Sequence, residues 1–249
     1  MRLISLILLF LLSGTVSAQK VEWYTTTQTS PWVKQKVKPE RTITGAEIVL
    51  DPAQRLQLIT GIGGCFNEMG WDALNALSAE DREAVLQAIF GKDGACFDYC
   101  RLPMGANDFA MSFYSSADVA GDFNLVNFNI DRDRYILIPY IKAARQINPD
   151  LRIWASPWCP PPWMKTNNHY ASAVRPSGEK DVNGLLPREA IAEFSTGFRM
   201  EEGYLKTYAD YFARFIKAYE AEGLPLECMF RMSLVPTRFF LVVNGARKI

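Results

Sequence analysis

Apolar side chains recur at helical spacing near the end of the chain, and this run gives the clearest element of the sequence. Gly223 and Pro225 end the pattern, because neither residue continues a helix readily. Side chains that share one helical face are most often core, so we expect packing here rather than a cofactor site. The face consists of Tyr204, Tyr208, Tyr211, Phe212, Phe215, Ile216 and Tyr219.

Earlier segments predict further helices. Ser78 can cap a helix that has Asp81 in its first turn and an apolar face behind it, and Gly91 ends this helix. A longer helical pattern covers residues 131–148. Its Pro139 should bend the helix or mark a late start, since proline lacks the amide hydrogen that a helix interior needs.

Short apolar runs alternate with these helices, and we expect strands at residues 61–66, 97–102 and 151–156, with another beginning near Leu224. This alternation indicates an α/β protein with parallel strands, and the long loops after the strands suggest the first half of a (β/α)8 TIM barrel. A small doubly wound sheet is the alternative. The GIGG sequence at residues 61–64 lacks the third glycine of a dinucleotide fingerprint, so we reject a dinucleotide site.

The N-terminal segment differs from the rest of the chain. Arg2, an apolar run from Leu3 to Leu12 and small residues before Gln19 are typical of a secretory signal peptide at residues 1–18. The run is too short to span a bilayer comfortably, so we expect a secreted, periplasmic or extracellular protein; an uncleaved anchor is the alternative. Residues 19–50 alternate in polarity and favour an extended arm or short strands.

The composition is that of a globular protein of one or two domains, with 249 residues, 49% hydrophobic content and a formal net charge of zero. Charges of both signs are interspersed, which argues against a nucleic-acid partner and leaves the oligomeric state open. Five cysteines leave at least one unpaired within a monomer. Because Cys96 and Cys100 share no familiar zinc spacing with Cys65, Cys159 or His169, we predict no metal and no other cofactor.

Residues 153–167, IWASPWCPPPWMKTN, place two tryptophans on a proline-rich loop directly after a predicted strand. Proline fixes φ near −65° and biases the preceding residue toward extended geometry, so Trp158 and Trp163 lie on stiff backbone. Flat aromatic faces stack on sugar rings, which predicts a carbohydrate-binding platform. The alternative is that this loop caps a hydrophobic core.

Four motifs follow one another along the chain: GIGGCFNEMGWDAL, RLPMGANDFA, DRDRYILIPYIKAARQINPDLRIWASPW and CPPPWMKTN. Together they resemble glycoside hydrolase family 30, the glucosylceramidase-like family, over residues 51–228. The resemblance implies a barrel whose first half is residues 51–230 and a side β-sandwich to which residues 19–50 contribute. It also implies metal-independent, retaining cleavage of β-glycosidic bonds by two glutamates about 5 to 5.5 Å apart.

The resemblance also assigns individual residues. Asp108 matches the aspartate that holds sugar hydroxyls beside the scissile bond, and Trp158 matches the tryptophan of the same subsite. Arg101 lies where the family has an arginine near the catalytic carboxylates, and we add Trp163 to the substrate-binding set because of its loop. Glu68 lies near a strand end, but the family does not use that position as a catalyst.

The family pattern stops after Phe230. An acid/base glutamate should follow an asparagine at the end of the fourth strand, whereas the chain continues with RMSL and has no acidic residue over 231–249. Inserting one base before the Met232 codon permits an Asn-Glu pair, so our hypothesis for residues 231–249 is a frameshifted, non-family tail. We therefore assign no catalytic residue.

Several functions stay open. The gene product is expected to be an exported retaining β-glycosidase, with the chain as given truncated and inactive. A carbohydrate-binding protein without chemistry and a non-functional fragment are the alternatives. In each functional case the expected partner is a carbohydrate or glycoconjugate, with glucosides, β-1,6-glucans, fucosides and xylans all open.

Overall fold

The computed structural model describes residues 22–38, 45, 51, 53–174, 183–192, 195 and 197–229, without the side chains of residues 228 and 229. The chain divides into two units, Met1–Gln57 and Leu58–Ile249. The predicted signal peptide and the predicted frameshifted tail lie outside the described residues. Among the helices that are described, none has the length and apolar character needed to cross a membrane.

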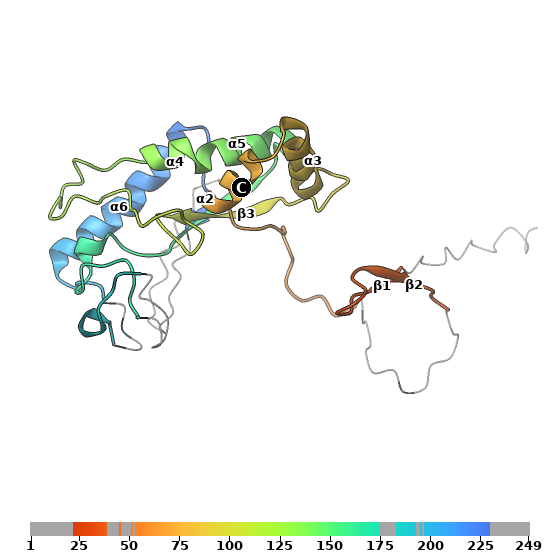
Figure 1. Ribbon diagram of the computed structural model, residues 1–249, viewed down its shortest axis with the longest axis horizontal. Coiled ribbons are helices and arrows are strands. Elements are labelled where there is room, and N and C mark those ends of the chain that lie inside the picture. The colour runs from red at the N-terminus through yellow and green to blue at the C-terminus, as the bar shows by residue number, and fades with distance from the viewer. Residues whose placement is uncertain are drawn as a thin grey trace, which may run out of the picture. The chain divides into compact units, whose positions relative to one another are not determined.

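The first unit contains a β-hairpin (Figure 1). β1 (Trp23–Thr25) pairs antiparallel with β2 (Val33–Gln35), in a register that places Tyr24 opposite Lys34. The ring of Tyr24 stacks on that of Trp32 with the centroids 5.2 Å apart. This segment therefore forms short strands, and its membership of a side β-sandwich stays a prediction.

The second unit is built on a parallel sheet. Its strand order is β3 (Tyr99–Met104), β4 (Arg152–Pro157) and β5 (Cys228–Met229). The register pairs Arg101 of β3 with Trp154 of β4. Compared with the sequence prediction, β3 lies two residues later and β4 one residue later, so the strand periodicity located both correctly but not their ends.

The predicted strand at residues 61–66 is not a regular strand, and this prediction was wrong. The backbone does follow β3, since the Arg101 amide donates to the Gly64 carbonyl at 2.8 Å, but only Cys65 forms an isolated bridge. The glycines of the GIGG sequence explain the course of the chain, because they let this backbone approach β3 more closely than any residue with a side chain permits.

Gly63 is the position in the GIGG sequence where this close approach is easiest to test. A Cβ there would overlap the carbonyl group of Tyr99, whereas a Cβ on Gly64 would meet only the ring of Phe97, at 3.2 Å. We expect Gly63→Ala to lower the free energy of unfolding by about 2 kcal/mol, because backbone must move. Gly64→Ala should cost less, since a side chain can rotate away. Urea unfolding followed by circular dichroism measures both variants, and equal losses would contradict the prediction.

In the described part of the chain, two helices precede β3. α3 (Ala79–Phe90) is the helix predicted from its cap, and Ser78 is its N-cap as expected. α2 (Glu68–Asn75) was not predicted, although Asn67 caps it with a side-chain hydrogen bond. Gly70 in its first turn lowers the local helix propensity, which hid this short element in the sequence.

The predicted helix at residues 131–148 is in fact two helices, α4 (Asp131–Tyr135) and α5 (Leu137–Ile147). Pro139 lies in the first turn of α5, where its missing amide hydrogen breaks no helical hydrogen bond, so it is compatible with the start of this second helix. The aromatic helix is α6 (Glu202–Ala221). Short 3₁₀ helices lie at Pro162–Met164 and Pro187–Glu189.

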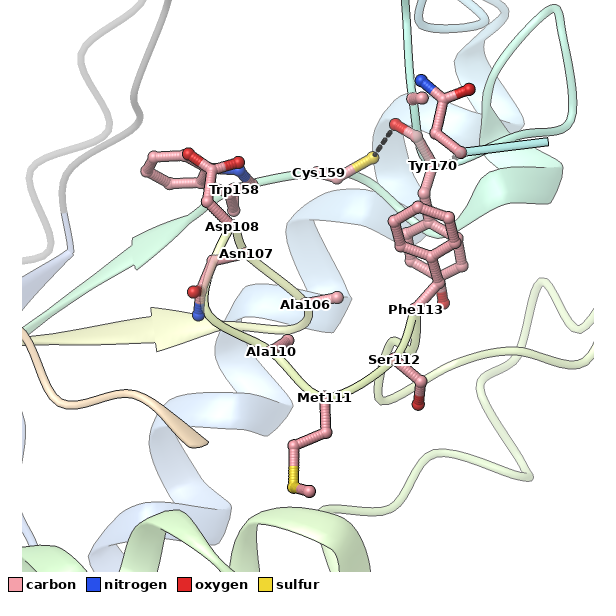
Figure 2. A pocket seen from close by; sticks show the side chains of 12 residues that line it. Ala106, Asn107, Asp108, Ala110, Met111, Ser112, Phe113, Trp158, Cys159 and Tyr170 are labelled. Carbon is pink, nitrogen blue, oxygen red and sulfur yellow. Dashed lines mark hydrogen bonds between the residues drawn. The ribbon is translucent and has the colours of Figure 1, made fainter. Parts of the chain in front are cut away.

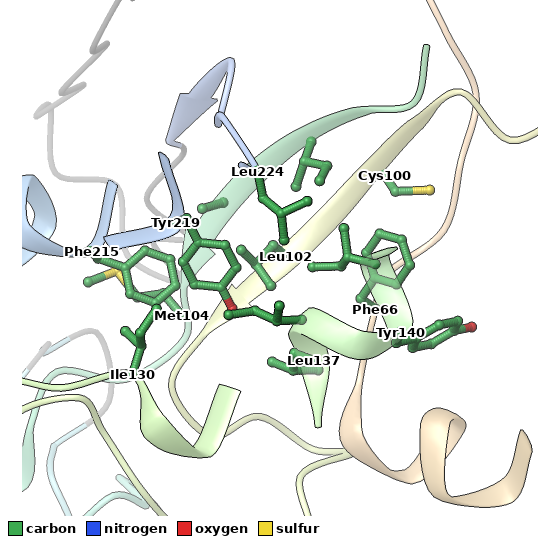
Figure 3. Close-up of a cluster of buried hydrophobic side chains, with 14 of the residues drawn as sticks. Phe66, Cys100, Leu102, Met104, Ile130, Leu137, Tyr140, Phe215, Tyr219 and Leu224 are labelled. Carbon is green, nitrogen blue, oxygen red and sulfur yellow. The ribbon is translucent and has the colours of Figure 1, made fainter. Parts of the chain in front are cut away.

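The main hydrophobic core lies between one face of the sheet and the helices (Figure 3). Leu102 and Met104 of β3 are buried there against Leu137 of α5 and Tyr219 of α6. The alternate residues of the strands, Arg101 among them, point to the other face. Because the strands are parallel, the loops that follow them meet at one edge of the sheet, where barrels of this kind place their sites.

Candidate functional site

A pocket of about 630 Å³ lies at the carboxyl ends of β3 and β4, between the loops that follow these two strands (Figure 2). Its volume is that of a small-molecule site. The residues that line it are Ala106, Asn107, Asp108, Ala110, Met111, Ser112, Phe113, Trp158, Cys159, Tyr170, Ala171 and Asn183.

The loop after β3 is closed by its own backbone. Gly105 has φ +80°, a left-handed conformation that favours glycine, and it turns the chain out of the strand. The amide of Ala106 then donates to the carbonyl of Tyr114 at 3.0 Å, which joins the two ends of the loop. Within the loop, the side chain of Asn107 accepts a hydrogen bond from the Phe109 amide at 2.7 Å. Asp108, at the tip, is exposed to the pocket.

Glu68 holds this loop in place through hydrogen bonds. Its buried carboxylate accepts hydrogen bonds from Nε and Nη2 of Arg132, at 2.6 and 2.7 Å, and from the amide of Met111 at 2.7 Å. The remaining guanidinium nitrogen, Nη1, donates to the Ser112 hydroxyl at 2.7 Å. The hydrogen bonds from Arg132 to Glu68 raise the pKa of the guanidinium further above its ordinary value. Glu68 is therefore engaged in holding the loop.

Lys165 holds the loop after β4 together through hydrogen bonds. Its side chain is buried, and the ammonium donates to the carbonyls of Tyr170 and Ala171, at 2.8 and 3.3 Å, and to the Ser172 hydroxyl at 3.2 Å. Burial lowers the pKa of Lys165, and the nearby Cys159 thiol only partly offsets that effect. The lysine thus fixes the wall of the pocket that Tyr170 and Ala171 form.

An aromatic contact joins the two loops. Phe113 stacks on Tyr170 with the ring centroids 5.1 Å apart and an interplanar angle of 16°. The hydroxyl of Tyr170 donates to a carboxylate oxygen of Asp118 at 2.8 Å, which fixes the orientation of the ring. The pocket therefore has one end at Asp108 and Trp158 and another at the Phe113–Tyr170 pair (Figure 2).

The structure brings Asp108 and Trp158 together as lining residues of this pocket. Arg101 lies beside them: its guanidinium is 4.9 Å from the ring centroid of Trp158 and donates to the Ser156 hydroxyl at 3.0 Å. It does not itself line the pocket. The role of all three in binding substrate stays a prediction.

Trp163 requires a correction. Its side chain is buried, and the indole nitrogen donates to the carbonyl of Ala117 at 2.8 Å. Its ring packs edge-on against Phe123 with the centroids 5.3 Å apart. A tryptophan with both its ring and its N–H engaged in the interior offers no face to a sugar. The two interpretations of the proline-rich loop thus apply to different tryptophans, with Trp158 at the pocket and Trp163 in the core.

Asp108 carries the one carboxylate among the residues that line the described pocket. A retaining glycosidase needs two, one to attack the anomeric carbon and one to protonate the leaving oxygen. The described residues also contain no cluster of three or more histidine, cysteine, aspartate or glutamate side chains that would hold a metal ion. Within the described residues, the polar and aromatic groups at this end of the pocket thus include the carboxylate of Asp108 and the indole of Trp158.

A buried carboxyl group lies behind the loop after β3. Tyr114 donates from its hydroxyl to Oδ1 of Asp133 at 3.0 Å, and Tyr219 donates to Oδ2 at 2.7 Å. Burial raises the pKa of Asp133 to about 6, an effect that outweighs the two hydrogen bonds, which lower the pKa. The carbonyl of Tyr114 accepts the hydrogen bond from Ala106 that closes the loop after β3. This buried cluster therefore helps to hold the pocket loop in place.

We expect the protein to lose stability as the pH rises from 4 to 6. In this range the folded state keeps a proton on Asp133 that the unfolded state, with a pKa of 3.8, has released. The free energy of unfolding should therefore fall by about 2 kcal/mol from this group. Asp133→Asn does not titrate and should flatten the profile. Urea unfolding at half-unit pH intervals compares the two proteins, and parallel profiles would refute the assignment.

Comparison with known proteins places this fold and pocket in a family. The model for the "Glycosyl hydrolase family 30 TIM-barrel domain" matches residues 59–184, just over half of the chain. The chain belongs to glycosyl hydrolase family 30. The resemblance found in the motifs is thus confirmed, and the α/β fold of the second unit is part of a TIM barrel.

Relatives in this family are similar over most of the chain. "Putative glucosylceramidase 4" of Caenorhabditis elegans is 30% identical over 215 residues, which cover 85% of this chain and 38% of that protein. "Lysosomal acid glucosylceramidase" of Mus musculus is 29% identical, with 76% and 33% covered. The solved structure "The endo-beta1,6-glucanase BT3312" has a TM-score of 0.57 at 26% identity, with 74% and 37% covered. The chain spans about a third of the length of the curated relatives that it matches.

Proposed function

We propose that the gene product is an exported retaining β-glycosidase, and that residues 58–229 supply the half of its active site that holds the sugar. The observation that carries this proposal is the meeting of Asp108 and Trp158 in one pocket at the carboxyl ends of β3 and β4. A carboxylate accepts charge-assisted hydrogen bonds from two vicinal hydroxyls, and an indole packs against the sugar ring. Because the relatives are named glucosylceramidases and an endo-β-1,6-glucanase, we favour β-glucosides as ligands.

Binding of methyl β-glucoside to the chain tests this proposal directly. We expect a dissociation constant on the order of 1 mM by isothermal titration calorimetry, as for a ligand held by few contacts. Asp108→Ala and Trp158→Ala should each weaken binding at least about tenfold, or about 1.4 kcal/mol. Asp93→Ala removes an exposed carboxylate outside the pocket and serves as the matched control. Undiminished affinity in both pocket variants would reject the site.

The same proposal holds that the chain as given binds but does not hydrolyse. Asp108 is the only carboxylate lining the described pocket, and the sequence from Arg231 to Ile249 contains no acidic residue. Without a nucleophile and a proton donor, the covalent route of a retaining enzyme is closed. A sample of verified mass should release no aglycone from aryl β-glucosides above background. Release that is lost in Asp108→Asn would show that the catalytic group has been misplaced.

A carbohydrate-binding protein without chemistry is the competing function, favoured by this single carboxylate. Sequencing the coding DNA around the Met232 codon separates the two, because, if one base has been deleted before that codon, another reading frame should encode Asn-Glu followed by more of the barrel. A coding sequence with no such deletion, followed by no further barrel sequence in any frame, would favour the binding protein.

A further inference from the structure

The pocket is larger than the part of it that Asp108 and Trp158 form. A volume of about 630 Å³ lies within the range of about 300 to 1,000 Å³ for drug-sized ligands, and a single hexose is smaller than such ligands. Figure 2 shows Asp108 and Trp158 at one end and the Phe113–Tyr170 pair at the other, with Cys159 between them. The second end has no role in holding a single sugar ring.

The Phe113 side chain gives this second end a flat apolar surface. Tyr170 stacks on one face of the ring and His169 packs edge-to-face with it at a centroid distance of 5.7 Å, yet Phe113 remains 52% exposed, so part of its apolar surface is accessible. The Tyr170 ring behind it is held by Asp118, at 2.8 Å, which makes the platform rigid. The C–H groups of a pyranose ring can stack on the exposed part of an aromatic ring that is held in place in this way.

Polar groups beside this surface can orient hydroxyls. Asn183 donates from Nδ2 to the Ala173 carbonyl at 3.0 Å and accepts from the Leu185 amide at 3.0 Å. An amide side chain has two N–H groups and two carbonyl lone pairs, so Asn183 keeps one donor and one acceptor for a ligand. An alkyl chain at this end would remove the amide from water without replacing those hydrogen bonds, which disfavours an apolar occupant.

We propose that the end of the pocket lined by Phe113, Tyr170 and Asn183 is a subsite for a second glycosyl unit, adjoining the unit held by Asp108 and Trp158. The inference rests on the proposed function and extends it, because it assigns an oligosaccharide with at least two linked sugars as the ligand. Phe113 sets the preference for length, and Asp108 holds the first ring.

Calorimetric titrations of the whole chain with methyl β-glucoside, gentiobiose and octyl β-glucoside test this subsite. We expect gentiobiose to bind about tenfold more tightly than methyl β-glucoside. Phe113→Leu, which keeps an apolar contact between the loops but removes the flat ring, should abolish that gain, as measured by the ratio of the two affinities in the same variant. Phe113→Tyr should keep the gain. Tyr135→Ala removes an exposed aromatic ring outside the pocket and should change neither affinity.

The possible outcomes separate the subsite from the function on which it rests. Binding of methyl β-glucoside with no gain for gentiobiose overturns the second subsite alone. Failure of every probe to bind overturns the proposed function. If octyl β-glucoside binds more tightly than gentiobiose and loses that advantage in Phe113→Leu, the second end takes an apolar aglycone and the inference is wrong. Thermal unfolding of each variant, monitored by circular dichroism, confirms that the protein titrated is folded.

Discussion

Glu68→Ala is expected to lower the free energy of unfolding by about 3 kcal/mol and to abolish measurable sugar binding. The carboxylate is buried and receives both the Arg132 guanidinium and the Met111 amide. Removing the buried partner leaves the half-buried Arg132 guanidinium and the Met111 amide without their acceptor, which is more costly than the pair is stabilising. The loop that carries Asp108 would then lose its anchor. Urea unfolding and titration with methyl β-glucoside measure the two effects.

Two further variants show whether the effect belongs to this anchor. Glu80→Ala truncates an exposed glutamate in the first turn of α3, and it should change stability by no more than about 0.5 kcal/mol. Glu68→Gln keeps one acceptor oxygen and should fall between wild type and Glu68→Ala. If Glu68→Ala unfolds at the same urea concentration as Glu80→Ala, the carboxylate does not hold the loop.

The elements that the sequence predicted correctly are those specified by neighbouring residues. α3 begins at the Ser78 cap, and α6 follows its own aromatic periodicity. Pro139 indicated an irregularity in the predicted helix, since its backbone is restricted whatever surrounds it, but the division into α4 and α5 was not predicted. For α3 and α6 the physical cause lies within one or two turns of helix, so a reading of the local pattern is sufficient.

Apart from α2, the features that were missed or predicted wrongly depend on residues far apart in the sequence. The 61–66 segment lies along β3 because its glycines permit close contact, and its hydrogen bonds go to residues more than thirty positions away. The Glu68–Arg132 pair spans 64 residues. No local pattern distinguishes a glutamate that will be buried against an arginine from one that will face water.

The same distinction explains the candidate site. Motif order along the chain led to Asp108 and Trp158, and the structure places both in one pocket. Trp163 sits in the same proline-rich loop as Trp158, and its orientation was predicted wrongly because it is fixed by Ala117 and Phe123 from another loop. Phe113 was not predicted at all, since only its stacking on Tyr170 gives it a place in the pocket.

Lys165→Met is the second prediction with a large expected effect. Methionine keeps the length of the side chain but cannot donate, so the carbonyls of Tyr170 and Ala171 and the Ser172 hydroxyl lose their shared donor. At about 1 kcal/mol for each hydrogen bond, the loss is about 3 kcal/mol. Part of it is offset because the buried ammonium no longer has to be desolvated, an effect already visible in its lowered pKa. We expect a net loss of about 2 to 3 kcal/mol.

The local nature of this loss is measured at the amide of Ala171, which donates to Nδ1 of His169 at 3.0 Å within the same loop. Hydrogen–deuterium exchange of this amide, quantified by mass spectrometry, should be at least about tenfold faster in Lys165→Met, because an opening made easier by about 1.4 kcal/mol is populated ten times more. Lys92→Met, an exposed substitution outside the pocket, controls for the loss of a positive charge. If this amide exchanges equally slowly in both variants, the carbonyls of the loop do not depend on Lys165. The pocket wall would then have to be held by other contacts, among them the Phe113–Tyr170 stacking and the Tyr170–Asp118 hydrogen bond.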